Sequence, residues 1–138
     1  MSLSSDPHNS FPALGVCYYP EHWPEDMWES DAKAMVAAGI SWVRIAEFAW
    51  SRIEPKRDIF SWDWLDRAVK TLSDAGLKIT MCTPTATPPK WLVDEMPDMI
   101  AIQADGTPRR FGSRRHYCFS HAGYRAESCR ITEAIAAR

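Results

Sequence analysis

Residues 43–66 read VRIAEFAWSRIEPKRDIFSWDWLD, and this short stretch combines the signals of a strand, a loop and a helix. At its start Val43 and Ile45 alternate with other residues, as in a strand whose successive side chains point to opposite faces. Pro55 favours an extended loop. Apolar residues at helical spacing follow between positions 65 and 72. The stretch is therefore typical of one β/α unit.

Strand and helix patterns alternate along the rest of the chain. We expect strands at 14–18, 40–48 and 77–82, helices at 24–39 and 61–76, a short helix between Pro88 and Pro97, and a last helix after Ser120. Gly39 and Gly76 end the first two helices, and Ser61, Thr87 and Ser120 are the expected N-caps. Asp105-Gly106 indicates a tight turn in a hairpin over 99–110. This order predicts an α/β fold with a parallel sheet.

The composition excludes several classes of protein. The net charge of the 138 residues is −2, which argues against nucleic-acid and membrane partners. No apolar run approaches the ~20 residues of a membrane span. Residues 1–12 are polar and lack a secretory signal, so we expect a disordered or expression-derived segment. The four cysteines form no C-x-x-C pair, and Cys17 and Cys82 are expected to be small buried residues. We expect a reduced, cytoplasmic protein.

Four motifs stand in order along the chain: LGVCYYPEHW at 14–23, the stretch from Trp50 to Asp66, TPTATPPKWL at 83–92 and RRHYCFS at 114–120. Together they resemble family 42 of the glycoside hydrolases, the β-galactosidases, over about residues 13–138. The loop after Pro55 departs from the family pattern, because it reads KRDI where a glycine is usual. The resemblance implies the N-terminal portion of a (β/α)₈ TIM barrel, with about three β/α units and the following helix.

The resemblance also implies that the chain is an incomplete barrel. A closed barrel typically needs about 250 residues, so we expect residues 13–138 to form a catalytic domain truncated before strand 4. Retaining glycosidases use two carboxyl groups. In the family the acid/base glutamate follows strand 4 within an Asn-Glu pair and the nucleophile follows strand 7. Asn9 precedes Ser10, and no Asn-Glu pair occurs here. We therefore predict no catalytic residue in this chain.

The implied parent protein is a retaining β-galactosidase that releases terminal β-D-galactose from β-D-galactosides. Its chemistry would need no cofactor, its substrate would be a galactoside, and we expect a homo-oligomer. The fragment alone is expected to be inactive. A different class of function remains open at this point, namely a non-catalytic carbohydrate-binding or assembly fragment.

Three glutamates, Glu21, Glu47 and Glu54, stand at the carboxyl ends of predicted strands, where barrel enzymes carry their sites. Glu47 could contact a sugar hydroxyl or support a group that does, or it could form a structural ion pair. Glu54 is expected to anchor its loop. Arg44 lies within a strand and needs a partner, because a buried unpaired charge is costly. Strand alternation places Glu47 on the opposite face, so we expect another partner for Arg44.

Four arginines and a histidine crowd one segment: Arg109, Arg110, Arg114, Arg115 and His116. Such a segment could bind phosphate or nucleic acid, or it could be a loop held by arginine hydrogen bonds. The resemblance favours a third interpretation, in which Arg114 hydrogen-bonds the galactosyl unit. A planar guanidinium can donate to two adjacent hydroxyls at once.

Cys118 lies in the same motif. One cysteine is no metal site, since structural zinc needs four ligands. In some family members, however, this cysteine joins three others in a zinc site, and those three would lie outside this chain. Cys118 is therefore a zinc-ligand candidate only for the full-length protein.

Aromatic residues gather at the expected carboxyl ends of the first two strands. They are Tyr18, Tyr19, Trp23, Phe48 and Trp50. Their flat apolar faces suit the C–H faces of a sugar ring, and they suit packing at the mouth of a barrel equally well.

Overall fold

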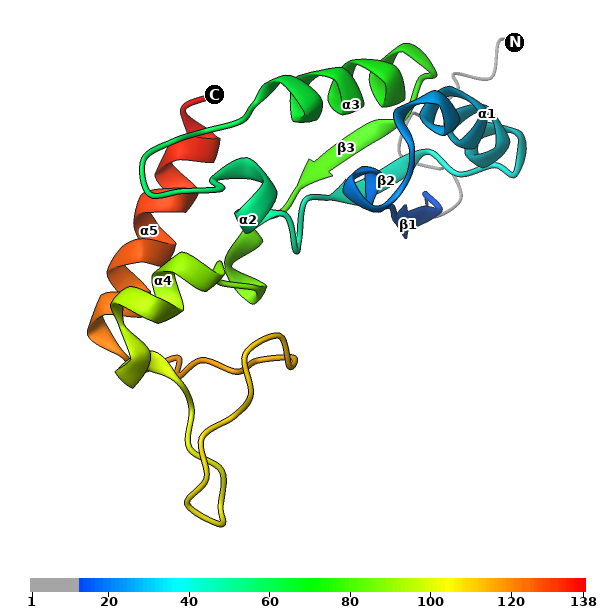
Figure 1. The fold of residues 1–138 in the computed structure, drawn as a ribbon. Helices are drawn as coiled ribbons and strands as arrows, with labels where there is room; N and C mark the ends of the chain where they lie inside the picture. Colours follow the sequence, from blue (N-terminus) through cyan, green and yellow to red (C-terminus); the bar gives the residue numbers. More distant parts are fainter. Residues whose placement is uncertain (1–12) are drawn as a thin grey trace, which may run out of the picture.

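The computed structural model describes residues 13–138, and the prediction for residues 1–12 lies outside this part (Figure 1). The helices are α1 (Trp28–Ala37), α2 (Trp50–Ile53), α3 (Asp63–Asp74), α4 (Lys90–Glu95) and α5 (Ala122–Ala136). Short 3₁₀ turns stand at η1 (Pro20–His22), η2 (Glu25–Met27), η3 (Pro84–Ala86) and η4 (Pro97–Met99). Within the described residues, no helix has the length and apolar character needed to cross a membrane.

The sheet has three parallel strands in the order β1 (Gly15–Cys17), β2 (Trp42–Ile45) and β3 (Lys78–Met81). Val43 in the central strand lies opposite both Val16 and Ile79. Helices connect the strands, as parallel pairing requires. The predicted α/β fold with a parallel sheet is therefore confirmed.

Helices α1 and α3 pack against each other, and their buried side chains, together with the strands, form the main core. Val43 and Ile45 are fully buried and so are Ala68 and Leu72 of α3. The buried positions of α3 recur at three- and four-residue spacing, which explains why this segment forms a helix against the sheet.

The opposite face of the sheet carries no helix in the described part of the chain. It exposes Trp42, and the ammonium of Lys78 lies 5.3 Å from the centroid of the Trp42 ring. Cys17 is also exposed and Cys82 is half-buried, so the prediction that both cysteines are buried is wrong. An apolar sequence pattern does not reveal which face of a strand the helices cover.

Glycines end the first helices as predicted. Gly39 and Gly76 both have positive φ, which favours glycine at a helix C-terminus. The N-caps differ from the prediction. Helix α3 begins after Trp62 without a side-chain cap, and α5 is capped by His121, whose Nδ1 accepts a hydrogen bond from the Tyr124 amide. Neither Ser61 nor Ser120 is the N-cap.

Two segments of the chain differ from prediction in extent. The loop after β2 contains the short helix α2, where an uninterrupted loop was expected. The hairpin over 99–110 is present but short: Ile102 and Pro108 form an antiparallel bridge, and Gly106 has the positive φ of the expected turn. The Arg109 amide donates to the Ala101 carbonyl at 2.9 Å, and the Gln103 amide donates to the Thr107 carbonyl at 2.8 Å. This arm projects away from the sheet (Figure 1).

Candidate functional site

The site begins where β2 ends. Ala46 has a φ of 68°, and this left-handed residue breaks the alternation of the strand. Glu47 therefore turns to the same side as Arg44, and the two side chains form an ion pair. The prediction that Arg44 finds another partner is wrong, because it assumed a strand that continued to Phe48. The ion-pair alternative for Glu47 is confirmed.

Glu47 is also bonded to the loop after β1. The Tyr19 hydroxyl donates to Oε2 of Glu47 at 3.3 Å, and the rings of Tyr19 and Phe48 lie 5.5 Å apart. The hydroxyl of Thr87 donates to the Phe48 carbonyl at 3.0 Å instead of capping a helix. These contacts join the carboxyl ends of β1 and β2 to the segment after β3.

The arginine-rich loop is held by its own polar groups. The guanidinium of Arg109 donates to the carbonyls of Arg114 and Arg115 at 3.2 and 3.3 Å. His116 is buried, and its Nδ1 donates to the Ser113 carbonyl at 2.9 Å. The alternative of a loop held by arginine hydrogen bonds is thus confirmed for Arg109. The guanidinium of Arg114 forms no ion pair among the described residues.

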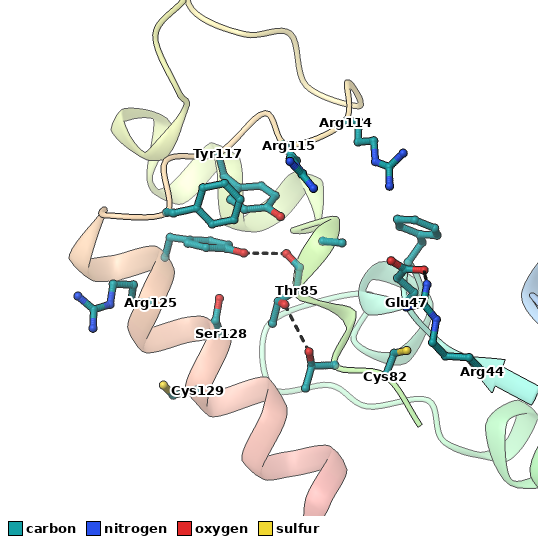
Figure 2. A pocket seen from close by; sticks show the side chains of 15 residues that line it. Arg44, Glu47, Cys82, Thr85, Arg114, Arg115, Tyr117, Arg125, Ser128 and Cys129 are labelled. Carbon is teal, nitrogen blue, oxygen red and sulfur yellow. Dashed lines mark hydrogen bonds and ion pairs between the residues drawn. The ribbon is translucent and has the colours of Figure 1, made fainter. Parts of the chain in front are cut away.

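Arg114 and Glu47 line the same cavity, which has a volume of about 770 Å³ (Figure 2). Figure 2 shows Arg114 reaching from its loop toward the side where Glu47 and Arg44 lie. Helix α5 forms the opposite wall through Tyr124 and Arg125. Four arginines and a carboxylate thus surround a space large enough for a sugar, and their donors and acceptors match sugar hydroxyls.

A second cavity of about 680 Å³ adjoins the first. The two share Arg44, Glu47, Phe48, Ala86 and Arg114. The second cavity extends outward between the loop after β1, the start of α4 and the loop of residues 111–116. Phe111, which the sequence analysis did not identify, lines it.

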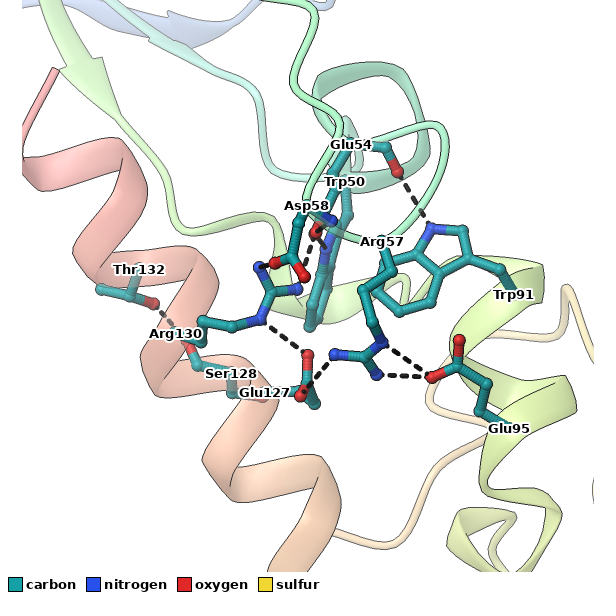
Figure 3. Close-up of polar contacts among 10 residues, drawn as sticks. All are labelled: Trp50, Glu54, Arg57, Asp58, Trp91, Glu95, Glu127, Ser128, Arg130 and Thr132. Carbon is teal, nitrogen blue, oxygen red and sulfur yellow. Dashed lines mark hydrogen bonds and ion pairs between the residues drawn. The ribbon is translucent and has the colours of Figure 1, made fainter.

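Glu54 lies outside both cavities and anchors its loop (Figure 3). Its side chain is fully buried. Its carboxylate accepts hydrogen bonds from Trp50 Nε1 at 2.9 Å, from Arg130 Nη2 at 2.8 Å and from the Asp58 amide at 2.8 Å. The predicted role of Glu54 as a loop anchor is confirmed.

The anchor continues as a chain of ion pairs that the sequence analysis missed (Figure 3). Arg130 also pairs with Glu127, which pairs with Arg57, and Arg57 pairs in turn with Glu95 of α4. Burial acts to raise the pKa of the Glu127 carboxyl, but hydrogen bonds from Arg57 and Arg130 outweigh it and hold the pKa below its ordinary value. The spacing of Glu127 and Arg130 on one helix is visible in the sequence, whereas their distant partners are not.

Glu21 is the third rim glutamate. Both carboxylate oxygens are buried and have no hydrogen-bond partner among the described residues. Burial raises the pKa of this carboxyl. The guanidinium of Arg52 lies nearby but donates to the Glu21 backbone carbonyl, at 2.7 Å. Glu21 lines neither cavity.

The aromatic residues at the strand ends divide between the core, the second cavity and the exposed surface. Trp50 is fully buried against Glu54, and the buried Tyr18 donates its hydroxyl to Asp31 at 2.8 Å, so both are packing residues. Tyr19 and Phe48 line the second cavity. Trp23 is exposed and lines neither cavity.

Cys118 has no metal-binding neighbours in the described part of the chain. No group of three or more histidine, cysteine or acidic residues there could hold a metal ion. The Cys118 amide donates to the Met99 carbonyl at 2.7 Å, which fixes the backbone of this segment. Residues 13–138 alone therefore do not fit a zinc site.

Comparisons with known proteins agree on one family. The model of glycoside hydrolase family 42, described as beta-galactosidase, matches residues 17–138. The chain is 55% identical over 125 residues to a beta-galactosidase of Thermus thermophilus. The matched region covers 91% of this chain and 19% of that protein. It is 54% identical over 125 residues to beta-galactosidase Bga of Halorubrum lacusprofundi, covering 91% of this chain and 18% of that protein.

Solved structures agree with this likeness. The beta-galactosidase from the psychrophilic Marinomonas ef1 matches with a TM-score of 0.86 and 52% identity, over 90% of this chain and 19% of that one. The chain thus spans about a fifth of the length of its relatives. The predicted fold class, the N-terminal portion of a (β/α)₈ TIM barrel, is confirmed. The match over residues 17–138 shows that this chain belongs to glycoside hydrolase family 42.

Proposed function

We propose that the protein containing this segment is a β-galactosidase, a retaining glycoside hydrolase that releases terminal β-D-galactose from β-D-galactosides. The observation that carries the proposal is the 55% identity over 125 residues to a beta-galactosidase. The cavity at the carboxyl ends of the strands supports it, because barrel enzymes place their sites at this face.

In this proposal Arg114 binds the galactosyl unit. Its guanidinium forms no ion pair within residues 13–138 and lines both cavities, so its donors are available to sugar hydroxyls. Glu47 holds Arg44 in place through their ion pair and can accept a hydrogen bond from the sugar at its remaining lone pairs. The ion pair and the Tyr19 hydroxyl fix the orientation of Glu47 before substrate binds.

The two catalytic carboxyl groups are proposed to lie outside this chain. We propose that residues 13–138 form an incomplete catalytic barrel, truncated before strand 4, and that the remaining units carry the acid/base and the nucleophile. The chemistry of two carboxyl groups requires no cofactor. Retaining enzymes hold these groups about 5–5.5 Å apart, which is the geometry that the complete barrel would have to supply.

Other properties of the full-length protein are also proposals. We propose a cytoplasmic homo-oligomer whose partner is its galactoside substrate, without nucleic-acid or membrane partners. Cys118 would contribute to a structural zinc site only if the remaining three ligands come from elsewhere in the protein.

A chimeric enzyme tests the proposed function. Residues 17–138 replace the matched segment of the Thermus thermophilus relative, and turnover of a β-galactoside is measured. We expect an active chimera, and we expect no turnover by the isolated 138-residue chain. A folded but inactive chimera contradicts the proposal and favours a non-catalytic carbohydrate-binding or assembly segment. Turnover by the isolated chain that survives repurification contradicts the placement of the carboxyl groups.

The role of Arg114 is tested in the same chimera. Arg114→Ala removes a charged hydrogen bond worth about 1.5–3 kcal/mol, so we expect kcat/KM to fall roughly 10- to 100-fold. Arg110→Ala is the matched control, because Arg110 lies in the same loop, is exposed and lines neither of the two cavities. Equal kinetics for the two variants would make Arg114 a structural residue.

A further inference from the structure

Two buried tyrosines join helix α5 to the segment that carries Arg114 (Figure 2). The rings of Tyr117 and Tyr124 are stacked, with their centroids 4.3 Å apart and their planes at 26°. The two residues are only 4% and 5% exposed. This burial comes from residues of the chain itself, so further units of the barrel can only add to it. Stacked aromatic pairs stabilise a contact beyond the area that they bury.

Tyr124 has a fixed position on its own side of the stack. Its amide donates to Nδ1 of His121 at 3.1 Å, and its hydroxyl donates to the Thr85 carbonyl at 2.8 Å. Burial raises the pKa of the Tyr124 hydroxyl, so this group stays protonated and remains a donor. Further along α5, Arg130 binds the buried Glu54. The Tyr124 ring is therefore held against the loop after β3 and, through its helix, against the loop after β2.

Tyr117 transmits this constraint to Arg114, three residues earlier in the chain. Ile100 and Tyr117 form an antiparallel bridge, which holds the backbone of the segment on its other side. Between Arg114 and Tyr117, Arg115 has a φ of 57°. A residue with a side chain keeps such a conformation only where its surroundings determine it. A shift of Tyr117 would therefore change the backbone at Arg115 and, with it, the direction of the Arg114 side chain.

We propose that Tyr124 is a positioning residue for Arg114, because its stack on Tyr117 sets the direction of the guanidinium that binds the galactosyl unit. This inference rests on the proposed function and deepens it, since it names the contact that orients the arginine of the binding site. The stack forms within the protein and is present before substrate binds. A guanidinium oriented in advance loses less conformational freedom on binding, which strengthens the interaction with the sugar.

A double-mutant cycle in the chimera carrying residues 17–138 tests this role. We measure kcat/KM for a β-galactoside with Tyr124→Leu, Arg114→Ala and both together. Because Tyr124 acts through Arg114, Tyr124→Leu cannot cost more than the roughly 10- to 100-fold expected for Arg114→Ala, and we expect a loss of about 10-fold. In the Arg114→Ala background the same substitution should cost less than about 2-fold, since residues that act as a unit are not additive. Tyr124→Phe keeps the stacked ring and should retain most of the activity.

Tyr18→Leu is the matched control, because Tyr18 is also buried and its hydroxyl also donates at 2.8 Å, in this case to Asp31. Any loss that Tyr18→Leu causes should be the same with and without Arg114. Tyr117→Leu removes the other ring of the stack and should behave as Tyr124→Leu does. It decides the question if Tyr124→Leu does not fold, and circular dichroism establishes which variants are folded.

The outcomes separate this inference from the proposed function. Equal losses for Tyr124→Leu in the two backgrounds refute the positioning role, while the proposed function stands. If Arg114→Ala leaves kcat/KM unchanged, the positioning role is refuted too, because the guanidinium that Tyr124 would orient does not contribute. A folded chimera without turnover refutes the proposed function and this inference with it.

Discussion

The buried ion pair between Glu54 and Arg130 offers a sharp test of what holds helix α5 in place. The Glu54 side chain is fully buried, whereas that of Arg130 is 28% exposed. Removing one partner of a buried pair typically costs about 3–5 kcal/mol, because the other charge stays buried. Arg130 keeps ion pairs to Glu127 and Asp58 in a Glu54→Ala variant. We therefore expect a loss in unfolding free energy near the lower limit, about 3 kcal/mol.

Glu54→Gln separates charge from shape. It keeps the volume of the side chain, but its amide group meets donors at Trp50, Asp58 and Arg130, all of which require an acceptor. We expect a cost of about 1–3 kcal/mol, the range for a buried polar group that loses its partner.

A double-mutant cycle with Glu54→Ala and Arg130→Met measures the coupling itself. Urea unfolding of the chimera that carries residues 17–138 is followed by circular dichroism and by tryptophan fluorescence, since Trp50 contacts the Glu54 carboxylate directly. The control is the exposed pair Glu25–Arg67, which has two nitrogen–oxygen hydrogen bonds where Glu54–Arg130 has one, and whose side chains are 42% and 55% exposed. Solvent screens exposed pairs, so its coupling should be much smaller. Equal coupling in the two cycles would refute the argument that burial makes the Glu54 pair strong.

Two further predictions follow from the exposed and buried surfaces of the chain. Glu21→Gln should raise the melting temperature at neutral pH. Burial raises the pKa of the Glu21 carboxyl. The protonated carboxyl therefore favours the folded protein below the ordinary glutamate pKa, and this contribution is lost as the pH rises through the pKa of the folded state. The gain should vanish in acid, and a variant that melts no higher at pH 7 contradicts the argument. The isolated chain should also self-associate, because β1 and β3 have open edges among the described residues and the uncovered sheet face exposes Trp42. Light scattering after size exclusion checks this, and a compact monomer at micromolar concentration would contradict it.

Local signals predicted the elements well and their ends less well. The apolar spacing in 65–72 and the glycines after α1 and α3 are properties of one segment, so the sequence alone indicates them. The prediction of Ser120 as the N-cap of α5 was wrong. Ser120 and His121 can both accept a hydrogen bond from the helix, and the geometry of the preceding turn selects His121. The short helix α2 was not predicted, because its four residues are too few to show the spacing of apolar residues that indicates a helix.

The candidate site was predictable in its residues and not in its contacts. Strand alternation failed at Ala46, where one left-handed residue brings Glu47 beside Arg44. Alanine gives no sign of this conformation, unlike glycine or asparagine. The position of Phe111 beside the second cavity was likewise hidden, because that cavity joins segments that are distant in the sequence.

The loop between β2 and α3 contacts the cavities through one glutamate and helix α5 through another. It therefore contributes both to the proposed binding site and to the stability of the fold. At its start Glu47 turns toward the cavities, while a few residues later Glu54 turns toward α5 and binds Arg130. Helix α5 in turn presents Tyr124 to the cavity, where the Tyr124 hydroxyl donates to the Thr85 carbonyl at 2.8 Å. A buried ion pair is weak evidence for stability by itself, since desolvation can cancel its attraction. Here it fixes the position of the helix that forms one wall of the cavity, so the double-mutant cycle also asks whether that wall stays in place.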